Sequence, residues 1–433
     1  MSDALAIVGG GWAGIAAAVA WVRRHGGAGV HLFDAGKRLG GRARAAEHHP
    51  TFGELDEGQH LLSGAYTETL ALMRQIGIAP ETVLQRLPLT LMDDAGFRLA
   101  LPRLPAPLHL AAGLLLARGV GWREKIRALA LGATLRRARI PLEEDVSVDR
   151  WLTARGQHGA FNTHLWRPLC LAALNTPAER ASARVFLNVL RDGIASRAPG
   201  ATDLLLPRAS LSRLLPDPAA AWLQQAGVTL HTGTRIRALQ ASADGWRLTS
   251  TDGSWTCARL ILAVAPQHLA ALLPEGETPP ALTCEPIATV YFQYPASATL
   301  PFPVFALAER EDGLSAWLIA RGAGCIAAVL SGHGAWETLP KTELAARLHT
   351  RITPLLGLTP RACPEHRILI ARRATFSCAP GLPRHPMLSR QPRLWLAGDH
   401  IWADYPATLE GAVRSGRAAG EAAAADRDNP ASP

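Results

Sequence analysis

The sequence predicts an α/β fold built from more than one domain. Residues 4–8 are apolar and predict a buried strand, residues 9–14 are rich in glycine and predict a tight turn, and residues 15–24 predict an alanine-rich helix. A second strand is predicted at residues 30–34, which completes a β-α-β unit. The chain has 433 residues, more than one hydrophobic core usually supports, so we expect two interleaved or consecutive domains.

The composition indicates the class of protein, and the net charge is compatible with several classes of ligand. Hydrophobic residues make up 48% and charged residues 19% of the chain, which indicates a folded globular protein. The net charge of +9 suits nucleic acid, anionic lipid or a phosphorylated ligand, but no nucleic-acid-binding motif is present, so we expect no nucleic-acid partner. None of the six cysteines forms a C-x-x-C pair, which predicts reduced thiols in a cytoplasmic protein and no metal site.

Beyond the first β-α-β unit, the predicted secondary structure is first mainly helical, then mainly strands, and ends in a strand, a turn and a helix. A helix is predicted at 64–76, followed by a region rich in proline, leucine and alanine and by helices within 160–195. Strand-like alternation returns at 227–262 and continues in several segments of 285–331. The C-terminal part predicts a strand at 394–397, a Gly-Asp turn and a helix over about 407–425.

The first motif is G-x-G-x-x-G, formed by Gly9, Gly11 and Gly14 between a strand and a helix. The first glycine permits the tight turn, the second lets the backbone approach a pyrophosphate, and the third lets the helix pack on the strand. Asp34 ends the next strand about twenty residues on, where a carboxylate can bind a ribose. These residues predict a dinucleotide site, and the alternative is a glycine-rich loop without a ligand.

A second glycine pair follows directly. Gly40 and Gly41 are flanked by Arg38 and Arg42, so backbone and guanidinium groups can approach the same pyrophosphate. Taken alone, the segment could be an ordinary basic turn. Its position just after Asp34 favours the cofactor interpretation.

A third segment closes the chain. Gly398 and Asp399 follow a predicted strand, and Pro406, Ala407 and Thr408 lead into the last helix. Such a turn can bring Asp399 and backbone N–H groups onto a ribityl chain and a flavin ring. A nicotinamide enzyme does not need a closing segment of this kind, so the sequence predicts FAD as the cofactor.

Together these segments resemble the amine-oxidase and phytoene-desaturase superfamily of FAD proteins over nearly the whole chain. The resemblance implies a Rossmann-type FAD-binding domain interleaved with an α+β substrate or cap domain. It assigns 1–78, 205–270 and 376–433 to the FAD-binding domain, and 79–204 and 271–375 to the substrate domain. In that superfamily the strand that matches Thr234–Ala238 contacts the adenine side of FAD, which makes Ile236 a candidate contact.

A narrower resemblance is to the hydroxysqualene dehydroxylases, the squalene-associated FAD enzymes of hopanoid-type pathways. It rests on long irregular strings at Asp56–Tyr66, Arg167–Pro177 and Ala181–Asp192, with further matches at Asp203–Pro207 and Pro406–Gly416. Residues 400–405 depart from the family's pattern after Gly-Asp, and Arg167 stands where an acidic residue is commoner.

The resemblance implies reductive removal of the hydroxyl of hydroxysqualene to give squalene, with hydride passing from reduced FAD to an allylic cation. Hydroxide leaves poorly, so an acid must protonate it. The candidates are Asp404 and His60 first, then Tyr405, Asp56 and Glu57. The alternative roles are a turn or helix N-cap for Asp404 and a structural histidine for His60.

Three polar residues are candidates to line the substrate pocket: Asn175, Thr176 and Asn188. Asn-Thr-Pro is equally an ordinary helix-ending turn. The other functions left open are an FAD-dependent carotenoid or polyprenyl desaturase or isomerase, and a non-enzymatic prenyl-binding protein. The flavin reductant and the oligomeric state are not predicted.

The expected substrate is a C30 isoprenoid that resides in lipid, so we expect peripheral contact with the inner face of the cytoplasmic membrane. The segment 101–139 combines an apolar stretch with a basic, partly amphipathic helix that begins near Gly121. The alternative for this segment is a solvated cap helix. No stretch of the sequence has the length needed to span a bilayer.

Overall fold

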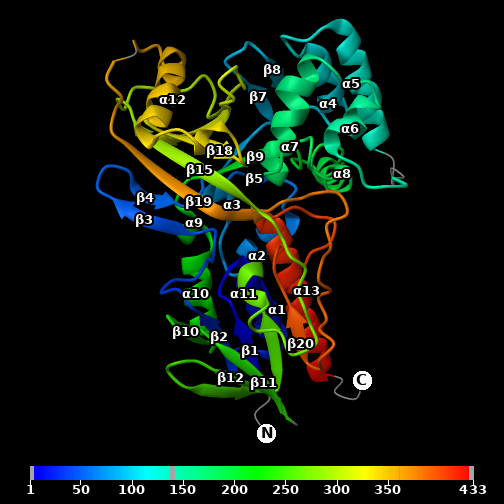
Figure 1. Cartoon of the computed structure of the whole chain (residues 1–433), viewed down its shortest axis with the longest axis vertical. Coiled ribbons are helices and arrows are strands. Elements are labelled where there is room, and N and C mark those ends of the chain that lie inside the picture. The colour runs from blue at the N-terminus through cyan, green and yellow to red at the C-terminus, as the bar shows by residue number, and fades with distance from the viewer. Residues whose placement is uncertain (1–3, 137–141, 243, 360, 429–433) are drawn as a thin grey trace.

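The chain is described by a computed structural model that covers residues 4–136, 142–242, 244–359 and 361–428. Residues 137–139 of the predicted basic segment lie outside these ranges. Both ends of the described chain lie at one end of an elongated molecule, and helices α4, α5 and α12 lie at the other (Figure 1). No helix among the described residues combines the length and the apolar character needed to cross a membrane.

A parallel sheet lies near the chain termini. It has five strands in the order β10-β2-β1-β14-β20. Their bounds are β1 Leu5–Val8, β2 Val30–Asp34, β10 Thr229–Thr232, β14 Arg259–Leu262 and β20 Leu394–Leu396. Strands from the start, the middle and the end of the chain therefore pair directly.

The two faces of this sheet are covered differently. Because strand side chains alternate, Leu5 and Ile7 join one buried cluster with the helices, whereas Ala6 and Val8 join another. The helical side carries α1 (Trp12–His25), α10 (Pro216–Gln225) and α13 (Leu409–Asp428), and the opposite side carries an antiparallel meander of β11 (Ala238–Ser242), β12 (Gly245–Thr249) and β13 (Ser254–Cys257).

Helices α1 and α13 pack closely because glycines face the backbone of α1. A Cβ added at Gly416 would lie 2.0 Å from the carbonyl oxygen of Ala13, and one added at Gly420 would lie 2.4 Å from that of Ala17. The contact joins the helix that follows the glycine-rich turn to the last helix of the chain.

A second, antiparallel sheet forms the centre of the molecule. Its order is β16-β17-β18-β15-β19. The strands are β15 Cys284–Gln293, β16 Val304–Leu307, β17 Ala316–Gly322, β18 Cys325–Ser331 and β19 His366–Phe376, and helix α12 (Lys341–Leu355) covers one face.

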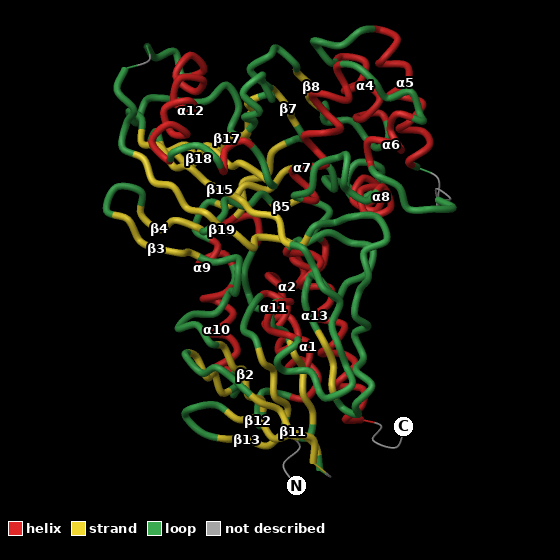
Figure 2. Tube along the Cα trace, viewed as in Figure 1, coloured by secondary structure: helices red, strands yellow, loops and turns green. Residues whose placement is uncertain are grey.

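A helical layer, called here the cap, adjoins this sheet (Figure 2). It consists of α4 (Leu108–Leu116), α5 (Trp122–Leu135), α6 (Val148–Thr153), a π-helical turn (Asn162–Trp166), α7 (Arg167–Leu174) and α8 (Ala183–Asp192). These helices share one buried cluster with the hairpin β7 (Thr90–Met92) and β8 (Arg98–Ala100). The predicted helices within 160–195 are confirmed.

The remaining elements are short. The strands are β3 Ala45–His49, β4 Gly53–Asp56, β5 Leu62–Ser63, β6 Leu84–Leu87 and β9 Leu204–Pro207, and the helices are α2 Thr67–Gln75, α3 Pro80–Val83, α9 Leu211–Leu214 and α11 Pro266–Leu269, with a 3-10 turn at Ala335–Glu337.

The predicted strand at Thr234–Ala238 is wrong in position. The structure starts β11 at Ala238, and the chain before it is irregular. The cause is a pair of backbone hydrogen bonds, from Thr234 to the carbonyl of Asp34 (2.9 Å) and from Gly233 to that of Gly36 (2.8 Å). The α/β fold class is confirmed, while the residue boundaries of the two domains stay a prediction.

Candidate cofactor and active site

The three motif glycines are needed for three different reasons. Gly9 has φ +110°, and a Cβ there would lie 2.3 Å from the carbonyl oxygen of Ala263. A Cβ at Gly14 would lie 1.8 Å from the oxygen of Gly9, so helix and turn touch there. At Gly11, within 4 Å a Cβ would meet only the Cα of Gly41, at 3.8 Å, in the described part of the chain. The space above Gly11, at the N-terminus of α1, fits a close approach of pyrophosphate.

Asp34 is fixed at the end of β2. Its Oδ2 accepts a hydrogen bond from the Gly10 N–H at 2.8 Å, and its Oδ1 accepts one from the Gly36 N–H at 2.6 Å. A carboxylate offers about four acceptor positions, so capacity remains for a ribose hydroxyl. Ile236 is buried in the same cluster as Phe33, which precedes Asp34.

Arg42 joins the two ends of the chain at this site. Its Nη2 donates to Oδ1 and Oδ2 of Asp399 at 2.7 and 2.8 Å, and its Nη1 donates to the carbonyl of Ala374 in β19 at 3.0 Å. Burial opposes ionisation of Asp399, but the attraction of Arg42 and the contacts with His400 together outweigh it and hold the pKa of this carboxyl well below its usual range. Asp399 is therefore ionised at neutral pH.

The glycine pair before Arg42 lies against the first motif. The Gly40 N–H donates to the carbonyl of Gly10 at 2.8 Å, and Gly40 forms a parallel bridge with Gly11. Arg38 does not join Arg42. Its exposed guanidinium instead pairs with Asp217 at 2.7 Å and lies 3.7 Å from Glu54.

The closing segment is held by α13. The Gly398 N–H donates to Ser415 Oγ at 3.1 Å, and Thr408 Oγ1 accepts from the Gly411 N–H at 3.1 Å, the pattern of a helix N-cap. Pro406 and Ala407 stand directly before this cap. Open space above Gly11, two helix N-termini and an ionised Asp399 fit the phosphates, ribityl hydroxyls and ring edge of FAD.

Asn175 and Thr176 are engaged within the protein. Asn175 ends α7 in the left-handed conformation; its amide donates to Thr375 Oγ1 at 3.0 Å and its Oδ1 accepts from the Gly332 N–H at 2.7 Å. Thr176 Oγ1 accepts from the Cys378 N–H at 3.0 Å. This geometry favours the helix-ending turn over a pocket-lining role.

Asn188 links the cap to the closing segment. Its amide donates to the carbonyl of Asp404 at 2.8 Å, and its Oδ1 accepts from Arg191. Helix α8 is thereby fixed against the residues that precede Pro406.

The acid candidates differ sharply in environment. Asp404 is exposed to solvent in a turn with φ +54°. His60 Nδ1 donates to the carbonyl of Gly58 at 2.6 Å, and burial lowers the pKa of its ring. Tyr405 is buried below the guanidinium of Arg414, and burial raises the pKa of its phenol.

Asp56 is a buried carboxyl close to His60 in sequence. Burial raises its pKa to about 6. Its Oδ1 accepts from the Leu211 N–H at 2.9 Å, whereas Oδ2 has no hydrogen-bond partner among the described residues and lies 3.8 Å from Arg321 Nη1. Among the carboxyls proposed as acids, Asp56 therefore has an environment that favours the protonated form.

Sequence reasoning missed Arg384. This half-buried residue stacks over the ring of Phe376 at 4.1 Å and donates to the carbonyl of Tyr405 at 2.9 Å, so it supports the closing segment. An isolated arginine in a proline-rich loop carries no signal of such a contact. Ser415 was inside a matched string, but its bond to Gly398 required the fold to be seen.

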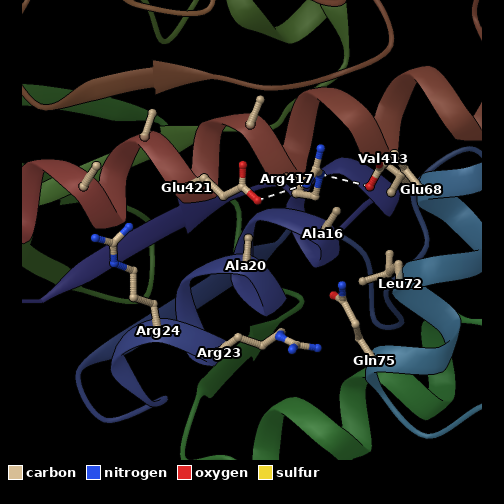
Figure 3. A pocket seen from close by; sticks show the side chains of 13 residues that line it. Ala16, Ala20, Arg23, Arg24, Glu68, Leu72, Gln75, Val413, Arg417 and Glu421 are labelled. Carbon is tan, nitrogen blue, oxygen red and sulfur yellow. Dashed lines mark hydrogen bonds and ion pairs between the residues drawn. The ribbon is translucent and has the colours of Figure 1, made fainter.

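A groove of about 740 Å³ lies elsewhere, between α1, α2 and α13 (Figure 3). Arg417 spans it and pairs with Glu68 and Glu421, while Ala16 and Ala20 form its floor. None of the predicted cofactor or catalytic residues lines it. We therefore do not assign the reaction to this groove.

Comparison with known proteins identifies the family. Residues 12–424 match the family described as flavin containing amine oxidoreductase. The chain belongs to this family. It is an FAD-dependent oxidoreductase, as the closing segment and the glycine motifs predicted.

Curated relatives share nearly the full length of the chain. A hydroxysqualene dehydroxylase of Rhodopseudomonas palustris is 28% identical over 97% of this chain and 98% of its own length, and one of Zymomonas mobilis is 25% identical over 96% and 98%. A probable zeta-carotene desaturase of Synechococcus elongatus is 26% identical over 54% of this chain and 51% of its own. The predicted resemblance to hydroxysqualene dehydroxylases is confirmed.

Solved structures confirm the fold. A cyclohexylamine oxidase from Brevibacterium oxydans matches with a TM-score of 0.70 at 16% identity, covering 99% of this chain and 100% of that one. A putrescine oxidase matches with a TM-score of 0.68 at 17% identity, covering 98% and 99%. These oxidases share the amine-oxidase-like architecture that the sequence predicted.

Proposed function

We propose that this enzyme removes the hydroxyl of hydroxysqualene reductively to give squalene. The observation that carries the proposal is the similarity, over at least 96% of this chain, to three curated hydroxysqualene dehydroxylases. The strings Asp56–Tyr66 and Arg167–Pro177 support the same activity. We also propose the domain division given above, with the FAD-binding domain formed by both chain ends and residues 205–270.

The reaction needs a hydride, a proton and an apolar site. Reduced FAD, when bound, supplies the hydride that reaches the allylic cation. The chain must protonate the departing hydroxyl, because hydroxide is a poor leaving group. Burial keeps Asp56 protonated up to a pH of about 6, which supports Asp56 as the proton source more than the exposed Asp404. His60 is suited to orienting a hydroxyl, since its Nδ1 is already engaged by Gly58.

The test is a single-turnover experiment. The purified protein is photoreduced anaerobically, mixed with hydroxysqualene in detergent, and followed at the visible flavin bands while squalene is measured by gas chromatography. Flavin reoxidation with stoichiometric squalene is the expected result. Reduced flavin that persists in the presence of hydroxysqualene would contradict the proposal.

The second candidate is a carotenoid or polyprenyl desaturase or isomerase. The similarity to a probable zeta-carotene desaturase over about half of both chains favours it as the runner-up. A desaturase runs in the opposite redox direction to the proposed reaction and reduces its flavin, so oxidised enzyme given a polyprenyl substrate separates these two activities. Bleaching of the oxidised flavin would favour the desaturase. The third alternative, a non-enzymatic prenyl-binding protein, does not fit an oxidoreductase family.

The proposed substrate also sets a location. A C30 isoprenoid resides in the bilayer, so we propose that the enzyme works at the inner face of the cytoplasmic membrane. Separation of cell extracts into soluble and membrane fractions, with and without a high-salt wash, tests this location.

A further inference from the structure

We propose that the α4–α5 hairpin of the cap is a docking surface for an anionic phospholipid bilayer. The surface, called here the hairpin patch, consists of Leu104, Leu108, Leu115, Leu116, Trp122 and Ile126 with the basic residues around them. This inference rests on the proposed function, because a substrate dissolved in lipid gives the enzyme a reason to dock there.

The apolar part of the patch stands out on the described surface. Six of the seven exposed large hydrophobic side chains in the described residues belong to it, and the seventh is Leu388. Leu116 and Trp122 are 72% and 64% exposed on the two sides of the loop that joins α4 to α5. All six lie on the packed helices α4 and α5 or just before α4, and grouped exposed apolar side chains mark an interaction site, whereas single ones need no explanation.

The charges around the patch have one sign. Between residues 101 and 136 the sequence has six basic side chains and a single acidic one, Glu124. Glu124 points inward, where its Oε2 accepts from the Phe161 N–H at 3.1 Å. Arg118, Arg123 and Arg127 are exposed. An apolar face rimmed by arginines is complementary to acyl chains below an anionic headgroup layer.

The hairpin is a formed surface. Ala128, Leu131 and Leu135 bury the opposite face of α5 in the cap core. Lys125 Nζ donates to the carbonyl of Leu115 at 2.8 Å, and the backbone of Arg118 pairs with that of Arg98 in β8. Leu116 and Trp122 are therefore held outward while the rest of both helices is anchored.

The patch also has a position suited to delivery. It lies at the end of the molecule opposite the chain termini (Figure 1). Helices α5 and α8 share the cap core, and α8 contacts the closing segment of the cofactor site through Asn188. A bilayer at the patch would lie on the cap side and leave the parallel sheet in water.

The test is flotation of the FAD-loaded full chain with vesicles, in the absence of hydroxysqualene. One set of vesicles is phosphatidylcholine alone, and the other is phosphatidylcholine mixed with phosphatidylglycerol. The apolar variant is Leu116→Ser with Trp122→Ser, and its matched control is Leu388→Ser, which removes a 58% exposed leucine outside the patch. The charge variant is Arg123→Gln with Arg127→Gln, with exposed Arg390→Gln as its control.

We expect the unmodified protein to bind the anionic vesicles more tightly and to lose that preference in high salt. The apolar variant should lower the vesicle partition constant on the order of tenfold or more, and both controls should leave it unchanged. The proposal would be overturned if Leu388→Ser lost as much vesicle binding as the apolar variant. It would also be overturned if the unmodified protein did not bind vesicles at all. A dimer in light scattering that the apolar variant dissociates would overturn it too, because a second copy would then cover the patch.

The two proposals fail separately. Vesicle binding is measured without substrate, and turnover is measured with hydroxysqualene in detergent. A protein that floats with vesicles but leaves hydroxysqualene unchanged contradicts the proposed reaction and supports the docking surface. The apolar variant should keep its thermal midpoint and its turnover in detergent.

Discussion

A side chain at Gly11 would enter open space, whereas one at Gly14 would collide with the turn. We therefore expect Gly11→Val to fold normally and to lose FAD, since its extended backbone (φ −72°, ψ −179°) suits valine and the added atoms occupy the space above the helix N-terminus. Flavin absorbance after purification and the thermal midpoint of the apoprotein measure the two effects.

The matched variant is Gly14→Ala. Its Cβ would lie 1.8 Å from the Gly9 oxygen, so the apoprotein itself should unfold at lower temperature. Full flavin occupancy in Gly11→Val would show that the cofactor does not approach this turn.

Asp56 should make stability depend on pH. Its pKa is raised from 3.8 to about 6, so the folded protein holds a proton that the unfolded chain releases between these values. The free energy of unfolding should therefore fall as pH rises from about 4 to about 6, by about 3 kcal/mol, at 1.36 kcal/mol for each pKa unit. Below about pH 4 the contribution is fully present.

The variant Asp56→Asn should remove this fall of the free energy of unfolding with pH, because an amide keeps an oxygen for the Leu211 N–H and does not titrate. Urea unfolding of the apoprotein at several pH values between these limits measures the free energy of unfolding. Asp252→Asn, on an exposed turn, is the control. A slope that persists in Asp56→Asn would assign the pH dependence to other groups.

Sequence reasoning found the cofactor residues better than the catalytic ones. The roles of Gly9, Gly11 and Gly14 follow from local steric rules, so the motif could be interpreted without the fold. The role of an acid depends on burial, which is set by distant segments. Asp404 and Asp56 could therefore not be ranked until their surroundings were known.

At the scale of elements, Glu410 connects the first turn of α13 to the start of α2. Its buried carboxylate accepts from the N–H groups of Glu68 and Thr69, from Thr69 Oγ1 and from Arg414 Nε. Unpaired donors at a buried helix start are costly, because that first turn has no internal acceptors for them.

We expect Glu410→Ala to lower the free energy of unfolding by about 3 kcal/mol, because the buried N–H and hydroxyl of Thr69 lose their acceptor, while Arg414 keeps its contact with Asp192. Glu421→Ala lies on the same helix, where its carboxylate pairs with Arg417 at the surface, and should cost less than about 1 kcal/mol. Chemical denaturation of both variants gives the comparison. Similar losses in the two would mean that Glu410 does not hold α2.

The elements that the sequence predicted are those with a local pattern. The strand predicted at 4–8, the helix predicted at 15–24 and the basic helix predicted to begin near Gly121 all appear within a few residues of the prediction. The strand expected at Thr234–Ala238 starts only at Ala238, because Thr234 bonds to the end of β2 and the chain first bonds to β12 at Arg237. Pairings between segments 200 or more residues apart left no periodic signal in the chain.

At the scale of the whole molecule, the cofactor site is where the two chain ends meet. Arg42 belongs to the first fifty residues, Asp399 to the last forty, and Ala374 to the central sheet, and the Arg42 guanidinium joins all three segments by contacting the other two. A ligand that binds here stabilises the folded chain by mass action, by about 2.7 kcal/mol at one hundred times its dissociation constant.

FAD removal should therefore loosen both chain ends together. In hydrogen exchange, we expect the backbone around residues 9–14 and that around 394–399 to lose protection in parallel when FAD is removed, and to regain it when FAD is returned. The Gly11→Val protein given the same FAD should not regain this protection from exchange. That control separates cofactor binding from any effect of the buffer. Recovery confined to residues 9–14 would contradict the role assigned to Asp399, because a cofactor that reached only the first motif would leave the Arg42–Asp399 contact free to open.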